Sequence, residues 1–110
     1  MRYMLLICGT EGELVDDGTP GMTIEEWVEE MDGRGVRVQG NRLADPADAT
    51  TVRVRRGEVL LSDGPFAETK ERMFGYDLLE CRDLDEALEV AAKHPMARAG
   101  MVEVRPFWTE

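Results

Sequence analysis

The feature that most constrains the fold is a short segment near the start of the chain, residues 3–8, with the sequence YMLLIC. Every position in it is apolar, so a strand built from it presents apolar side chains on both faces. A single sheet with helices on one side leaves its other face in water. The sequence therefore predicts a cover for the second face, and a second copy of the chain, with its sheet facing the first, would supply it.

A first helix is predicted to begin at Thr23, which forms a capping-box pattern with Glu26, and to end at Gly33 or Gly35. Its apolar positions share the i, i+3, i+4 and i+7 spacing of an amphipathic helix. They are Ile24, Trp27, Val28 and Met31. We expect Trp27 to be the buried anchor of this helix.

A second helix is predicted to begin after Asp83, with Glu86 at its third position, and to stop before Pro95. Its predicted apolar stripe comprises Leu84, Ala87, Leu88, Ala91 and Ala92. The single histidine, His94, follows this helix, where a cation interacts favourably with the helix dipole. We interpret His94 as a structural residue of the helix terminus, and the alternative is a catalytic role.

Strands are predicted at residues 3–8, 36–43, 50–56, 58–62, 73–81 and 101–105. Gly40 is a candidate for a bulge in the second of these. The third and fourth form a hairpin broken at Arg56-Gly57, with Val52 and Val54 on one face. Without this inserted hairpin the order is β-α-β-β-α-β, the ferredoxin-like α+β arrangement. We expect one domain over residues 1–110, with an antiparallel sheet and two helices on one face.

The composition excludes several classes of protein. A net charge of −10, from 23 acidic and 13 basic residues, opposes non-specific binding to nucleic acid or an anionic membrane. No apolar run approaches the roughly 18 residues of a membrane span, and the start lacks a signal-peptide pattern, so we expect a cytoplasmic protein. Neither metal-ligand spacing nor a phosphate-binding glycine loop occurs, so we expect no metal or cofactor. Cys8 and Cys81 are predicted to be buried thiols.

Residues 62–71, SDGPFAETKE, concentrate charge around a turn-forming Asp-Gly-Pro sequence. Asp63 either stabilises the turn alone or acts as an acid or base in a concave site at the end of a strand. Lys70 and Arg72 are candidates for holding an anionic ligand. The candidates for the aromatic walls of its pocket are Phe66, Phe74, Tyr76 and Trp27. The alternative is that the charges pair with one another in solvent and the aromatic residues belong to the core.

The uninterrupted DGPFAETKE of residues 63–71 resembles the signature of the DGPF family, which is related to the YCII-like proteins. The MRYMLLI start, the GYDLLE segment, the LDEALEVAAKHP helix and the VEVRP end are also similar, so the resemblance covers nearly the whole chain. It implies a ferredoxin-like α+β domain that pairs as a dimeric α/β barrel. It also implies a biochemical function that is largely undefined.

The resemblance further implies an acid–base dyad, formed by a histidine on the first helix and the aspartate of the Asp-Gly-Pro turn. Asp63 matches the aspartate, but residues 23–33 contain no histidine. Similar proteins are often encoded near, or joined to, extracytoplasmic-function sigma factors, which implies an accessory or regulatory role. Three hypotheses result: a small-molecule binding protein, an isomerase- or lyase-type enzyme acting on a small organic acid through Asp63, and a regulatory partner.

Overall fold

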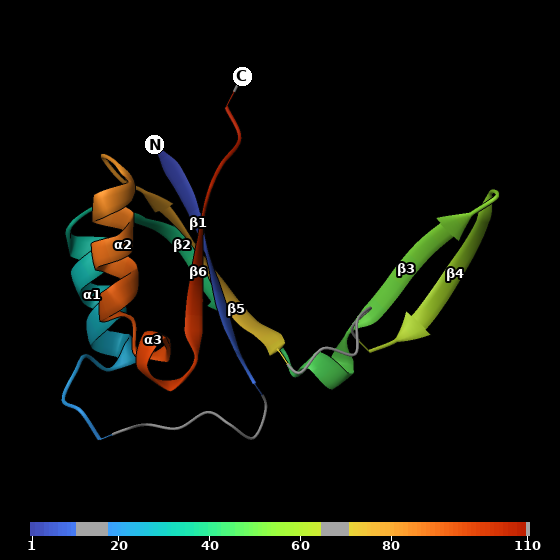
Figure 1. Ribbon diagram of the computed structural model, residues 1–110, viewed down its shortest axis with the longest axis horizontal. Helices are drawn as coiled ribbons and strands as arrows, with labels where there is room; N and C mark the ends of the chain where they lie inside the picture. Colours follow the sequence, from blue (N-terminus) through green and yellow to red (C-terminus); the bar gives the residue numbers. More distant parts are fainter. Residues whose placement is uncertain (11–17, 65–70, 110) are drawn as a thin grey trace.

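The computed structural model describes residues 1–10, 18–64 and 71–109 (Figure 1). Within these ranges the chain has an α+β architecture with antiparallel sheets and three α-helices. In chain order the elements are β1 (Arg2–Thr10), α1 (Ile24–Gly33), β2 (Arg37–Arg42), a 3-10 turn (Pro46–Asp48), β3 (Thr50–Arg55), β4 (Glu58–Asp63), β5 (Glu71–Glu80), α2 (Leu84–Lys93), α3 (Met96–Ala99) and β6 (Met101–Pro106). The short helix α3 was not expected from the sequence.

The main sheet has four strands in the order β2-β5-β1-β6, all antiparallel, and the helices cover one of its faces (Figure 1). In the central strand β1, alternate side chains face the helices and are buried, beginning with Tyr3 and Leu5. Met4, Leu6 and Cys8 lie on the other face and are half-buried. The strand that is apolar at every position therefore has one face packed and one face partly open in the single chain.

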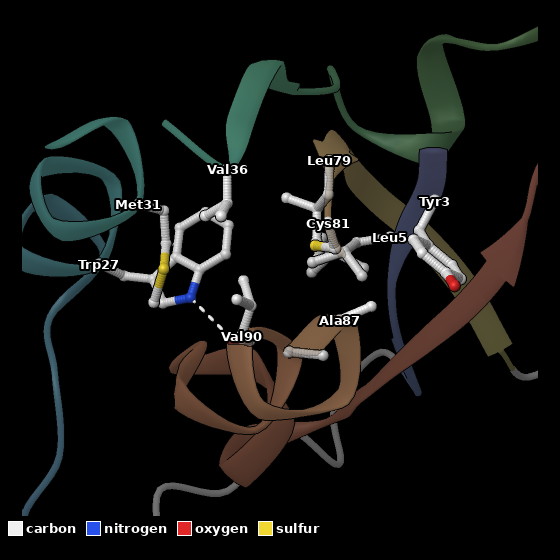
Figure 2. Packing of buried hydrophobic residues seen from close by; sticks show 11 residues of the cluster. Tyr3, Leu5, Trp27, Met31, Val36, Leu79, Cys81, Ala87 and Val90 are labelled. Carbon is white, nitrogen blue, oxygen red and sulfur yellow. Dashed lines mark hydrogen bonds between the residues drawn. The ribbon is translucent and has the colours of Figure 1, made fainter. Parts of the chain in front are cut away.

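The core lies between the sheet and the helices, where side chains from β1, β5, α1 and α2 converge (Figure 2). Trp27 has no exposed surface, and its indole Nε1 donates a 3.0 Å hydrogen bond to the Val90 carbonyl oxygen. The predicted role of Trp27 as a buried anchor is confirmed. So is the capping box, because Thr23 and Glu26 exchange side-chain to backbone hydrogen bonds of 3.2 Å in both directions.

The predicted buried apolar face of α2 is correct at Ala87 and Ala91 and wrong at other positions. Leu84 and Leu88 are each 47% exposed, whereas Val90, which the prediction omitted, has no exposed surface. Ala87 and Val90 lie three positions apart and face α1 and the sheet, so the buried face is rotated from the predicted one. The period of a helix allows either face to be apolar, and the carbonyl of Val90 is the acceptor for Trp27. The contact with α1 therefore selects the face.

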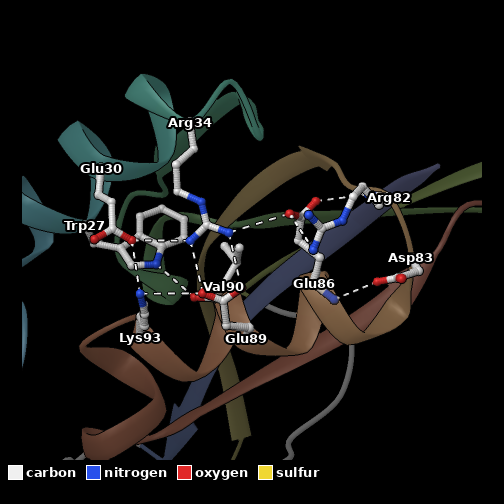
Figure 3. Close-up of polar contacts among 9 residues, drawn as sticks. All are labelled: Trp27, Glu30, Arg34, Arg82, Asp83, Glu86, Glu89, Val90 and Lys93. Carbon is white, nitrogen blue, oxygen red and sulfur yellow. Dashed lines mark hydrogen bonds and ion pairs between the residues drawn. The ribbon is translucent and has the colours of Figure 1, made fainter.

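Charged side chains join the outer surfaces of α1 and α2 (Figure 3). Arg34, which follows α1, bonds the Glu89 carboxylate through both terminal nitrogens at 3.1 Å and lies 3.6 Å from Glu86. The hydrogen bond from Arg34 lowers the pKa of Glu89. Lys93 adds an ion pair of 3.3 Å to Glu30. These contacts keep the two helices in register above the core.

Strands β3 and β4 form a separate two-stranded sheet that extends away from the helices and the main sheet (Figure 1). Its turn lies at Arg56 and Gly57, which have φ of 52° and 77°, so the predicted hairpin and its break are confirmed. Val52 pairs with Leu61, and both are well exposed, at 60% and 67%. The hairpin therefore carries an apolar face that the rest of the described chain does not cover.

No helix in the described ranges has the length and apolar character that a membrane crossing requires.

Candidate functional site

A cavity of about 670 Å³ opens between α1, the segment His94–Ala99 and the strands β1, β2 and β5. Part of its wall is apolar. The larger apolar side chains around it are Ile7, Ile24, Val28, Phe74 and Met96. Ile24 was expected to pack in the core but is 42% exposed, because it borders this cavity.

The sheet side of the cavity contains a paired arginine and aspartate. Arg37 Nε donates a 2.9 Å hydrogen bond to Asp77 Oδ1, and the same arginine lies 3.3 Å from Asp32. Asp77 is only 6% exposed, and its burial raises the pKa of the carboxyl while the bond from Arg37 opposes the rise. The charge of Arg37 is therefore balanced within the protein.

Gly40 makes room for this pair. A Cβ at this position would collide with the Asp77 carboxylate and the Tyr76 carbonyl, and the Gly40 carbonyl accepts a 3.1 Å hydrogen bond from Arg37. The predicted bulge at Gly40 is wrong, because the register shift of β2 falls between Arg37 and Gln39. The glycine instead permits close approach of a side chain from the neighbouring strand.

His94 lies at the helix side of the cavity and is 3% exposed. Its Nδ1 accepts a 3.0 Å hydrogen bond from the Met96 backbone N–H. The centroid of its ring lies 4.7 Å from the centroid of the Trp27 ring, in an edge-on arrangement. Burial lowers the pKa of His94 to about 4. The predicted structural role at the helix terminus is confirmed, because His94 is the C-cap residue of α2. The expected interaction of a cation with the helix dipole is wrong, because the ring is neutral at pH 7. Since Nδ1 is an acceptor, the neutral ring carries its proton on Nε2.

Arg98 on α3 also borders the cavity. Its Nη2 donates a 3.4 Å hydrogen bond to the Met22 carbonyl oxygen, while its Nε is buried and has no hydrogen-bond partner among the described residues. Arg42, at the end of β2, borders the cavity as well and is exposed. Sequence reasoning missed both arginines, because a lone arginine after Pro95 or at a strand end carries no motif.

The residues predicted for the site from the sequence are placed differently. Asp63 is exposed at the end of β4, opposite Thr50, and is not among the residues around the cavity. Arg72 lies in β5 opposite Gly9 and also does not border the cavity. Tyr76 does border it, although strand alternation directs its side chain to the face opposite Asp77.

Phe66 and Lys70, the other two predicted ligand-binding residues, lie outside the described residues.

The described residues hold no group of three or more His, Cys, Asp or Glu side chains that could bind a metal ion. Both cysteines are free thiols, and Cys81 is buried as expected, whereas Cys8 is half-buried. Burial raises the pKa of the Cys81 thiol, so it is held in the unreactive form. Among the described residues, the charged, amide and imidazole side chains that border the cavity are those of Arg37, Arg42, Arg98, Asp77, Asn41 and His94.

Comparison with known proteins gives two matches. The family model of the YCII-related domain matches residues 1–109. A curated protein of Rhizobium meliloti (strain 1021), named "Uncharacterized protein R00369", is 46% identical over 68 residues. That match covers 60% of this chain and 55% of the relative, so the chain spans about half the length of the curated protein it matches. The name of that relative assigns no activity.

Proposed function

We propose that this chain, which belongs to the YCII-related domain family, binds a small organic molecule in the cavity between α1, α3 and the main sheet. The observation that carries the proposal is the cavity itself. Its volume of about 670 Å³ lies within the roughly 300–1,000 Å³ of small-molecule sites. Such sites combine apolar walls with a few convergent polar groups, and here Phe74 and Met96 supply wall while His94 and Arg98 supply polar groups.

A screen of metabolites by thermal shift tests this proposal. A ligand present at 100 times its dissociation constant should stabilise the folded chain by about 2.7 kcal/mol. Ala99 borders the cavity, so Ala99→Phe should fill part of it and abolish the shift. Ala92→Phe introduces the same side chain at an exposed position of α2 and should leave the shift unchanged. The proposal fails if no compound gives a shift that Ala99→Phe removes.

We further propose that the domain is ferredoxin-like and pairs as a dimeric α/β barrel. The strand order β2-β5-β1-β6 with helices on one face supports the first part. The half-buried side chains of Met4, Leu6 and Cys8 on the opposite face support the second, because a second sheet would cover them.

The enzyme hypothesis, with Asp63 as acid or base on a small organic acid, stays a prediction. It has less support than binding, because Asp63 is exposed and does not border the cavity. The regulatory hypothesis rests on the resemblance to proteins encoded beside sigma factors. Binding is therefore the function that the geometry favours.

A further inference from the structure

We infer that the ligand of this cavity is an organic carboxylate, and that Arg98 and Arg42 receive its negative charge. The inference rests on the proposed binding function and names the chemical class of the ligand. It begins with the charges around the cavity, of which Arg37 and Asp77 neutralise one another across 2.9 Å. Neither Arg42 nor Arg98 forms an ion pair with another residue in the described ranges.

Two uncompensated guanidinium groups at one cavity are notable in a chain whose net charge is −10. An acidic surface repels anions, so a site for one needs a local excess of positive charge. Other arginines of this chain are neutralised by the protein itself, since Arg34 and Arg37 each have a carboxylate partner within 3.5 Å. Arg42 and Arg98 have no such partner in the part of the chain that the structure describes, and an anionic ligand in the cavity would supply the missing negative charge.

The guanidinium of Arg98 makes one long hydrogen bond to the backbone. Its Nη2 donates to the Met22 carbonyl, and a side chain at Gly21 would collide with the same guanidinium. The buried Nε remains a donor without a partner among the described residues. A buried donor without an acceptor is unfavourable, and because this Nε has almost no exposed surface, the guanidinium must turn toward the cavity before a ligand oxygen can reach it. The planar guanidinium with parallel N–H donors matches the two oxygens of a carboxylate.

The rest of the wall indicates the ligand's other end. Ile24, Val28 and Met96 present hydrocarbon, which suits an apolar body rather than a bare inorganic anion. His94 is held with Nδ1 accepting from Met96, so it offers an uncharged ring at the same wall. A neutral ring leaves the positive charge of the site to the arginines. The ligand class that fits is a carboxylate attached to an apolar aliphatic or aromatic group.

Matched acid and amide probes test the inference. Benzoate, phenylacetate and hexanoate are each compared with their primary amides by ligand-observed NMR titration, at constant ionic strength. We expect each acid to bind at least tenfold more tightly than its amide. Arg98→Gln should weaken the acids at least tenfold and leave the amides unchanged. Arg55→Gln removes the same charge from the exposed hairpin and should change neither.

Arg42→Gln provides a second test at an exposed position, where loss of stability is not expected to interfere as it could for Arg98→Gln. This variant should weaken binding of the acids severalfold. Equal binding of acids and amides, insensitive to both arginine variants, overturns the carboxylate assignment and leaves cavity binding standing. If Ala99→Phe does not affect binding of the acids, the anion binds on the surface and the carboxylate assignment is overturned. The assignment is also overturned if inorganic phosphate binds as tightly as the acids do. If neither series binds at millimolar concentration, the assignment fails. The proposed function then also fails if the metabolite screen gives no shift that Ala99→Phe removes.

Discussion

The body of the molecule and its β3–β4 hairpin both contain strands with an apolar face, yet only in the body do other parts of the described chain cover such a face. In the body, Leu5 and Leu79 are completely buried between the sheet and the helices. In the hairpin, every residue of β4 is exposed, and Leu61 keeps 67% of its surface. A two-stranded hairpin alone is marginally stable in water. The difference shows that the sequence of a strand specifies which of its faces are apolar, while another part of the fold, or another chain, decides whether such a face is covered.

The largest expected effect lies in the body. Trp27→Ala removes a fully buried ring and its hydrogen bond to Val90, so it should lower the free energy of unfolding by about 3–5 kcal/mol. Leu61→Ala in the hairpin removes an exposed side chain and should cost less than about 0.5 kcal/mol in the monomer. Denaturant midpoints measure both. Equal losses at the two positions would break the comparison, because they would show that the hairpin face is packed.

The second expected effect is a pH dependence of the body that comes from His94. Its pKa falls from 6.5 to about 4 on folding, so the unfolded chain binds the proton more readily. Stability from this residue is complete above pH 6.5 and is lost as the pH falls toward 4, by up to about 1.4 kcal/mol per unit. Chemical denaturation at pH 7, 6, 5 and 4 measures it.

The control for this effect is His94→Asn, whose side-chain Oδ1 occupies the position of the ring Nδ1 and can still accept from the Met96 N–H. This variant retains the carboxylate contribution to the acid slope and lacks the histidine contribution. Its stability should therefore fall less steeply than that of the parent chain between pH 6.5 and 4. Identical slopes for the two chains would mean that folding does not lower the pKa of His94.

The third effect concerns the outer face of the sheet, where a dimer would cover it. Leu6→Glu places a charge on this half-buried face and should weaken self-association at least tenfold, or about 1.4 kcal/mol. Leu84→Glu makes the same change at an exposed position of α2 and should leave association unaltered. Sedimentation velocity at micromolar concentration measures both. A parent chain that sediments as a monomer contradicts the proposal.

The hairpin can be examined in the same experiment. If the hairpin face is also covered by a second copy, Leu61→Glu should weaken association as Leu6→Glu does. If Leu61→Glu has no effect, the hairpin face lies outside the interface that covers the body, and the two apolar faces differ in this respect too.

The smallest effect is expected at Asp63, at the base of the hairpin. Asp63→Asn retains most turn hydrogen bonding, so stability should stay within about 1 kcal/mol of the parent chain. Because Asp63 does not border the cavity, we expect ligand binding to be retained. Loss of binding or activity at unchanged stability would favour the functional interpretation of Asp63 over the turn interpretation.

The sequence by itself determined the features that depend on residues a few positions apart. The capping box of Thr23 and Glu26, the cap of α2 by Asp83 and the hairpin turn at Arg56 all lie where their motifs predict. Each is closed by hydrogen bonds or backbone angles within about four residues, so the local residue types suffice.

The tertiary structure alone decided the face of α2, the neutral burial of His94 and the position of Arg98 beside a cavity. These depend on contacts between distant segments, such as the bond between Trp27 and Val90, which are 63 residues apart. Burial and charge balance at a residue are properties of whatever packs against it, and a sequence pattern specifies only what that residue offers. For this reason the helices and strands were largely predictable, while the residues of the candidate site were not.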